Sequence, residues 1–105
     1  MVSIKSFREL ALSLPTVSEQ PHFDRASFRV NKKIFATLDE KNAQVNVMLS
    51  VEDQDVFCTF DKTVIYPVPN KWGLKGATTI ELNKVKKSML ADALKTAYAK
   101  ATAKK

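Results

Sequence analysis

Cysteine and histidine are scarce in this chain of 105 residues, which has one of each, Cys58 and His22. A single cysteine forms no internal disulfide, which fits a reducing compartment. Two residues cannot supply the four ligands of a Cys/His zinc site. We therefore expect a cytoplasmic protein without a bound metal or cofactor.

Long apolar runs and glycine-rich loops are also absent. No run approaches the roughly 20 apolar residues of a membrane span, and no signal-peptide apolar region precedes Arg8 and Glu9. The only two glycines, Gly73 and Gly76, are not followed at once by a predicted helix, so they do not form a phosphate-binding loop. These absences exclude a membrane-spanning protein and a P-loop enzyme, and the length favours a single domain over residues 1–105.

Positive charge is present and unevenly distributed. The net charge is +6, and residues 61–105 alone hold ten basic and three acidic side chains. A basic field of this kind favours polyanionic partners, above all nucleic acid. Lysines that only keep a small domain soluble are the alternative explanation.

Hydrophobic periodicity predicts three helices. The first begins at Ser3, whose hydroxyl can cap it, and ends before Pro15. The second begins at Ser50, with Asp53 three residues later. Its apolar face is predicted to consist of Val56, Phe57 and Phe60. Asn83 is predicted to cap the longest helix. The apolar stripe of that helix comprises Val85, Met89, Leu90, Ala93, Leu94, Ala97, Tyr98 and Ala101.

Alternating apolar and polar residues predict strands between the helices. Residues 17–23 contain Pro21 and suit an edge strand. Residues 28–36 read as two strands joined at Asn31-Lys32 or Asn31-Lys32-Lys33. In the second of these strands, Ile34, Ala36 and Leu38 are predicted on one face, and Phe35 and Thr37 on the other. Further strands are predicted at 45–49, 64–66 and 78–82, with a strand end and a turn at 72–76.

The predicted order is helix, three strands, helix, two or three strands, helix. Because the strands come in runs, this order favours an α+β domain with an antiparallel sheet of about five to six strands and helices on one face.

With these elements in order, the chain resembles the MmcQ/YjbR-like family of small bacterial proteins over nearly its whole length. The resemblance rests on short segments in a fixed order, namely Leu14-Pro15, residues 19–23, residues 28–36, residues 45–49, Lys71-Trp72-Gly73 and a closing helix with Tyr98 near its end. The family often has a glycine where this chain has Asn31-Lys32. The resemblance implies a CyaY-like α+β fold and a double-wing DNA-binding role, in which β-hairpins flank a helix.

The leading hypothesis is a non-enzymatic, monomeric DNA-binding module of low sequence specificity. Phosphate contacts from a basic hairpin and from the second strand region would carry the affinity, and Trp72 among lysines could stack on bases. The candidate residues are Arg25, Arg29, Lys32, Lys33, Lys71, Trp72 and Lys75. This hypothesis requires the hairpin tip to lie on the same face as Lys71 and Lys75.

Two other hypotheses remain open. One is a protein- or small-ligand-binding domain whose sheet face presents Phe35, Tyr66 and Trp72. The other is an enzyme, which would need His22 beside an acid such as Glu19 or Asp24. In a strand, positions 19 and 22 point to opposite faces, which argues against such a pair. Cys58 is expected to be a buried, unreactive thiol.

Overall fold

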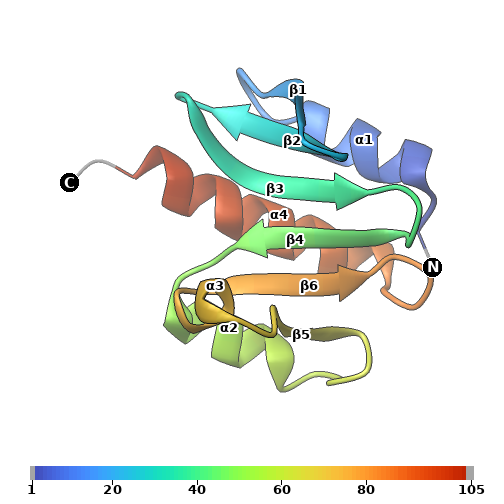
Figure 1. The fold of residues 1–105 in the computed structure, drawn as a ribbon, viewed down its shortest axis with the longest axis vertical. Helices are drawn as coiled ribbons and strands as arrows, with labels where there is room; N and C mark the ends of the chain where they lie inside the picture. The colour runs from blue at the N-terminus through green and yellow to red at the C-terminus, as the bar shows by residue number, and fades with distance from the viewer. Residues whose placement is uncertain (1, 104–105) are drawn as a thin grey trace.

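The computed structural model describes residues 2–103, which form one antiparallel sheet of six strands with four helices (Figure 1). The strands are β1 (Ser18–His22), β2 (Arg25–Val30), β3 (Lys33–Asp39), β4 (Gln44–Met48), β5 (Ile65–Pro67) and β6 (Ala77–Glu81). The helices are α1 (Ile4–Leu12), α2 (Val51–Cys58), α3 (Lys71–Leu74) and α4 (Lys87–Thr102). The strands lie in the order β1-β2-β3-β4-β6-β5. The α+β prediction is confirmed, although four strands rather than three precede the second helix.

The two faces of the sheet differ in what covers them. Helix α4 packs against β2, β3 and β4, with α1 beside it. Alternation along β4 turns Val45 and Val47 toward these helices, where both are fully buried. The rings of Phe7 and Phe28 meet edge to face in the same core at 5.1 Å. No helix of the described residues packs across the opposite face of β2, β3 and β4, which is left open to solvent.

Two of the three predicted helix starts are confirmed. The hydroxyl oxygens of Ser3 and Ser50 accept hydrogen bonds from the backbone N–H groups of Ser6 and Asp53, at 3.0 and 3.1 Å. Asn83 does not cap the last helix, which begins at Lys87 without a side-chain cap. Residues 82–85 instead form a turn in which the N–H of Lys84 bonds the Glu81 carbonyl at 3.1 Å. Burial of Leu82 explains this turn, because the chain must bring that side chain into the core before the helix starts.

A β-bulge changes the predicted faces of β3. Phe28 pairs with Ala36, but Arg29 pairs with Ile34, so Phe35 is the extra residue. Phe35 consequently points inward and is fully buried, with its ring 5.8 Å from that of Tyr98. The expectation that Phe35 shares an exposed patch with Tyr66 and Trp72 is therefore wrong.

The second helix also differs from the prediction in the face that it buries. Of the predicted apolar face, Phe57 is half-buried against the core, as expected, whereas Val56 and Phe60 are exposed and the fully buried position is Gln54. Helix α2 packs against β5, a three-residue strand at the edge of the sheet. Too little apolar surface lies there to cover a whole helix face, so only part of α2 is buried.

Candidate functional site

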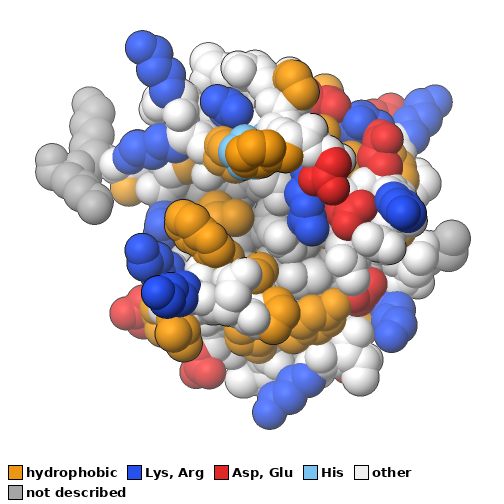
Figure 2. All heavy atoms as spheres, in the orientation of Figure 1, with side chains coloured by type: hydrophobic (Ala, Val, Ile, Leu, Met, Phe, Trp, Pro, Cys, Tyr) orange, Lys and Arg blue, Asp and Glu red, His pale blue; other side chains and the backbone are white. Residues whose placement is uncertain are grey.

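A hollow of ≈ 660 Å³ lies on the open face of the sheet. Its walls come from the β1–β2 turn on one side and from the segment around α3 on the other, and its floor comes from β3 and β4. The lining residues are His22, Phe23, Arg25, Ile34, Thr37, Asn46, Met48, Val68, Asn70, Trp72 and Ala77. Figure 2 shows hydrophobic side chains around this hollow, with the single histidine in pale blue at one wall.

Phe23 forms one wall in a conformation that phenylalanine seldom adopts. It occupies the β1–β2 turn with φ of 59°, in the left-handed region, and its side chain is 95% exposed. Its ring contacts that of His22 at 4.9 Å. A bulky residue at positive φ costs on the order of 1–2 kcal/mol, and a fully exposed ring contributes little to the core. Strain and exposure together make Phe23 a candidate functional residue.

Trp72 lines the hollow from the side of α3 and is 63% exposed. Sequence analysis predicted a strand end and a turn here, but residues 71–74 form the short helix α3. The side-chain oxygen of Asn70 accepts from the Trp72 N–H at 2.8 Å and starts this helix. The Lys75 ammonium lies 5.4 Å from the centre of the indole ring, within cation–π distance. Helix α3 thus presents an aromatic ring and a positive charge together.

Three residues fix α3 against the sheet. The buried Gln54 side chain donates to the carbonyls of Gly73 and Ala77, at 2.8 and 3.0 Å. A Cβ on Gly73 would lie 1.9 Å from the Val68 carbonyl oxygen, so only glycine permits this approach. Gly76 has φ of +109° and meets the Leu49 carbonyl in the same way.

The predicted lysines gather at one end of the sheet. The β2–β3 turn and α3 lie at the same end in Figure 1, and Lys32, Lys33, Lys71 and Lys75 are all exposed. Lys33 and Lys100 line a small depression that shares Ile34 and Met48 with the hollow. In Figure 2 the blue side chains follow one another down the left of this face, and acidic ones group at its upper right. The hairpin tip and α3 therefore share an end of the sheet, which is one requirement of the condition that the sequence hypothesis set.

Arg25 and Arg29 are less available than the lysines. Arg25 lines the hollow but forms an ion pair with Asp39, with 3.7 Å between Nη2 and Oδ2. Arg29 is half-buried, and its Nε donates to the Ser27 hydroxyl at 3.1 Å. Both arginines are on the open face, but part of their charge or bonding capacity is already used within the protein.

Polar side chains at the far end of the open face bond one another. The Thr79 hydroxyl donates to Asn46 Oδ1 at 2.8 Å. Tyr66 and Gln44 both donate to Glu81 Oε2. The Glu81 hydrogen bond, together with burial, raises the pKa of Tyr66 to about 12. Tyr66 is therefore a held, half-buried group and not part of the predicted apolar patch.

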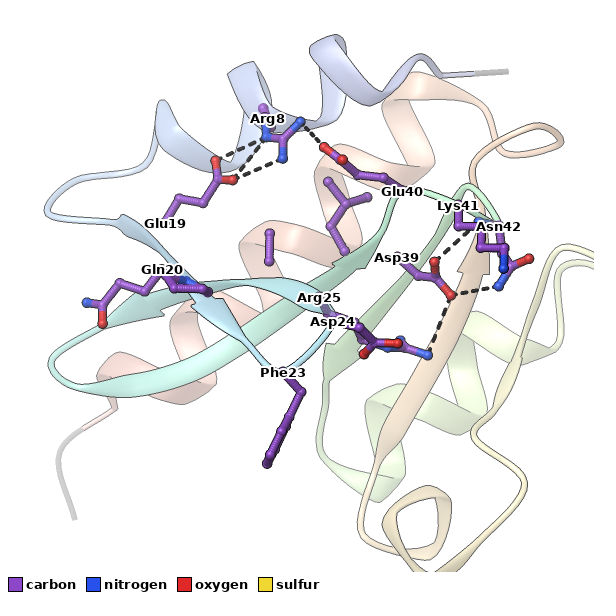
Figure 3. A pocket seen from close by; sticks show the side chains of 13 residues that line it. Arg8, Glu19, Gln20, Phe23, Asp24, Arg25, Asp39, Glu40, Lys41 and Asn42 are labelled. Carbon is purple, nitrogen blue, oxygen red and sulfur yellow. Dashed lines mark hydrogen bonds and ion pairs between the residues drawn. The ribbon is translucent and has the colours of Figure 1, made fainter.

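A second hollow, of ≈ 1090 Å³, adjoins the first on the other side of the β1–β2 turn. Figure 3 shows Arg8 pointing between Glu19 and Glu40, while Phe23 extends away from these charged groups. Arg8 bonds both carboxylates, and its Nη2 lies 3.1 Å from Glu19 Oε2. Because these charges neutralise one another, this hollow offers little to a charged ligand.

His22 and Glu19 lie on opposite faces of the sheet, as expected from the strand alternation. Glu19 faces α1 and is held by Arg8, whereas His22 lines the open-face hollow. Burial and the charge of Asp55 raise the pKa of the Cys58 thiol, which makes it a poor nucleophile. Over residues 2–103, no cluster of three or more His, Cys, Asp or Glu side chains could hold a metal ion. None of the helices within that range is long and apolar enough to cross a membrane.

Sequence analysis missed Phe23 as a site residue. A signal was present, because an aromatic residue stands in the polar tetrapeptide His22-Phe23-Asp24-Arg25, where a tight turn favours glycine or asparagine. Alternation alone gave no reason to place this ring opposite Trp72.

The fold matches solved structures of two bacterial proteins. The crystal structure of Deinococcus radiodurans protein DR2400, with the domain DUF419, superposes with a TM-score of 0.84 at 19% identity, covering 99% of this chain and 81% of that one. A structural-genomics target from Pseudomonas syringae superposes with a TM-score of 0.68 at 15% identity, covering 91% of this chain and 96% of that one. At such identities the likeness concerns the fold alone.

Sequence comparison gives the family. No curated protein matches the chain, and the names of the two structural neighbours state no enzymatic activity. The family model described as YjbR matches residues 12–100, which is most of the sequence. The match agrees with the resemblance found in the sequence, and the chain belongs to the YjbR family.

Proposed function

We propose that this protein binds nucleic acid through the open face of its sheet, with little sequence specificity and without catalysing a reaction. One observation carries the proposal: Phe23 and Trp72, both exposed, line one hollow, and the hairpin tip and α3 lie together at one end of the sheet. Aromatic rings beside a basic track are the combination that nucleic-acid-binding surfaces use.

The charges support a polyanion as the ligand. Phosphates attract lysines without regard to sequence, and each neutralised phosphate releases counterions. Lys32, Lys33, Lys71 and Lys75 are exposed, and none of them takes part in an ion pair within residues 2–103. No carboxylate of the described residues therefore neutralises these charges. Weak specificity follows, because Arg25 and Arg29 are engaged within the protein and few other side chains could read base edges.

A salt-dependent titration tests the proposal. Fluorescence anisotropy of labelled DNA should show binding at low salt, with log affinity falling by about 0.9 per log unit of salt for each duplex phosphate neutralised, or about 0.7 for a single strand. Replacing Lys71 and Lys75 by glutamine should weaken binding. It should also make the salt dependence less steep, by the equivalent of about one to two phosphate contacts. Absence of binding at tens of micromolar protein in low salt would contradict the proposal.

The matched control removes the same charge from the covered side of the molecule. Lys5 and Lys95 are exposed and belong to α1 and α4, the helices that pack on the other face of the sheet. The double replacement of Lys5 and Lys95 by glutamine changes net charge equally. It should leave affinity and salt slope nearly unchanged if the site is on the open face.

A protein- or small-ligand-binding role is the second candidate. The hollow has a volume of ≈ 660 Å³, within the range of small-molecule sites, and Leu74 beside it is 80% exposed. Binding of such a ligand would bury apolar surface and depend little on salt. A partner whose affinity stays constant from low to high salt would favour this role over nucleic acid.

A further inference from the structure

We infer that the ligand is single-stranded, and that an unpaired base enters the hollow and stacks between Phe23 and Trp72. This inference rests on the function proposed above and specifies its ligand. It follows from the kind of ligand surface on which the aromatic side chains of Phe23 and Trp72 could stack.

Aromatic walls need an exposed ring face to stack on. The bases of a duplex are stacked on one another and show only their edges in the grooves. Unpaired bases expose both faces and stack on aromatic side chains whatever their sequence. Phe23 and Trp72 come from segments 49 residues apart in the sequence, yet they line one hollow. Both side chains therefore border the space that a flat ring would enter.

Phe23 has no evident structural purpose. Its side chain is almost wholly exposed, and its backbone lies in the left-handed region. Its ring contacts that of His22, another residue that lines the hollow. A glycine would satisfy the turn better, so the ring is best explained by the ligand that it contacts.

The charges around the hollow indicate where the phosphates of a bound strand would lie. The β2–β3 turn and α3 lie toward one end, so the phosphates would run beside Lys33, Lys71 and Lys75. Two polar residues of the floor, Thr37 and Asn46, line the hollow, and the Asn46 Oδ1 already accepts from the Thr79 hydroxyl. Two such groups orient a base without selecting one strongly.

The fluorescence of Trp72 reports on this site directly, because it is the only tryptophan. Titration with oligothymidine should quench this fluorescence, since a stacked base contacts the indole. A self-complementary duplex of the same length should bind more weakly and quench less. Phe23→Ala should weaken single-strand binding by about 5- to 100-fold, the equivalent of one lost stacking contact, and should leave duplex binding nearly unchanged.

Phe60→Ala is the matched control, since Phe60 is also exposed, at 63%, but does not line the hollow. It should bind oligothymidine like the unaltered protein, and a thermal melt confirms that each variant is folded. Duplex binding as tight as single-strand binding, or single-strand binding unaffected by Phe23→Ala, would overturn the inference and leave nucleic-acid binding standing. Failure of both polymers to bind would overturn the inference and the proposed function together.

Discussion

The side-chain amide nitrogen of Gln54 lies 2.8 Å from the carbonyl oxygen of Gly73, the residue that follows Trp72. The same nitrogen donates to the Ala77 carbonyl at 3.0 Å. One buried side chain in α2 therefore closes the segment that carries α3 onto the sheet. The position of the indole at the hollow depends on this polar contact as well as on apolar packing.

Replacing Gln54 by alanine should lower the free energy of unfolding by about 1–3 kcal/mol, because two carbonyl groups lose their shared buried donor. Urea denaturation followed by circular dichroism measures this loss. Gln20→Ala is the control, since the Gln20 side chain is exposed and donates to the Ser18 hydroxyl at 3.3 Å. Its effect should stay within about 0.5 kcal/mol. Equal losses in the two variants would contradict the structural role of Gln54.

Gly76→Ala should destabilise the protein by at least about 3 kcal/mol, because a side chain at this φ is strained and must also displace a neighbour. The φ of +109° excludes an ordinary side-chain conformation, and the added Cβ would lie 1.8 Å from the Leu49 carbonyl oxygen. Thermal denaturation measures the change. The adjacent, exposed Lys75→Ala should alter stability by no more than about 0.5 kcal/mol. A Gly76→Ala protein that melts like the unaltered one would show that this contact is wrongly described.

Phe23→Gly should raise the free energy of unfolding by up to about 1 kcal/mol, because glycine adopts positive φ without strain. The same change should abolish quenching of Trp72 by oligothymidine. Asp24→Gly is the control within the same turn: Asp24 has no positive φ, so glycine there should destabilise slightly. A gain in stability with a loss of binding identifies Phe23 as a residue kept for function. A Phe23→Gly protein that melts earlier would argue for a structural role of the ring.

Tyr66 should make stability depend on alkaline pH. Its folded pKa of about 12 exceeds the ordinary value of 10.0, chiefly through the Glu81 hydrogen bond. The folded state thus holds the phenol proton more tightly than the unfolded state, so the stabilisation is complete below pH 10.0 and is lost as pH rises toward about 12. Urea denaturation across this interval should show the decline.

Two tyrosine variants check the assignment of that decline. Tyr66→Phe should reduce the decline between the two pKa values and lower stability at neutral pH, because Glu81 loses one of its two donors. Tyr98→Phe removes a hydroxyl that donates to the Pro15 carbonyl at 2.7 Å, and it should leave the decline in place. A Tyr66→Phe protein with an unchanged alkaline decline would assign the effect to other groups.

Sequence periodicity predicts the buried face of a strand well where the strand pairs regularly, without a bulge. Val45 and Val47 alternate with Asn46 and are buried, as expected. The prediction fails at Phe35, because the bulge adds a residue to one strand only. The local pattern does not predict the extra residue. Packing of the Phe35 ring against Tyr98, a residue distant in the sequence, favours the bulge.

Local sequence also determines most helix ends, because a cap concerns neighbouring residues. Ser3 and Ser50 cap their helices by accepting hydrogen bonds from the backbone N–H groups three residues later in the sequence. Asn83 has the right chemistry for a cap but not the role, since burial of Leu82 delays the helix to Lys87. The buried face of α2 likewise depends on what it meets, and it meets the edge strand β5.

By itself, the sequence determined the fold class, the family segments and the excess of positive charge, because these follow from periodicity, order and composition along the chain. Only the tertiary structure brought Phe23 and Trp72 to one hollow and placed the β2–β3 turn at the same end of the sheet as α3. The physical reason is the sheet order, in which β4 pairs with β6 and carries the α3 segment to the open face. Such a neighbourhood is set by long-range strand pairing, which no local pattern encodes.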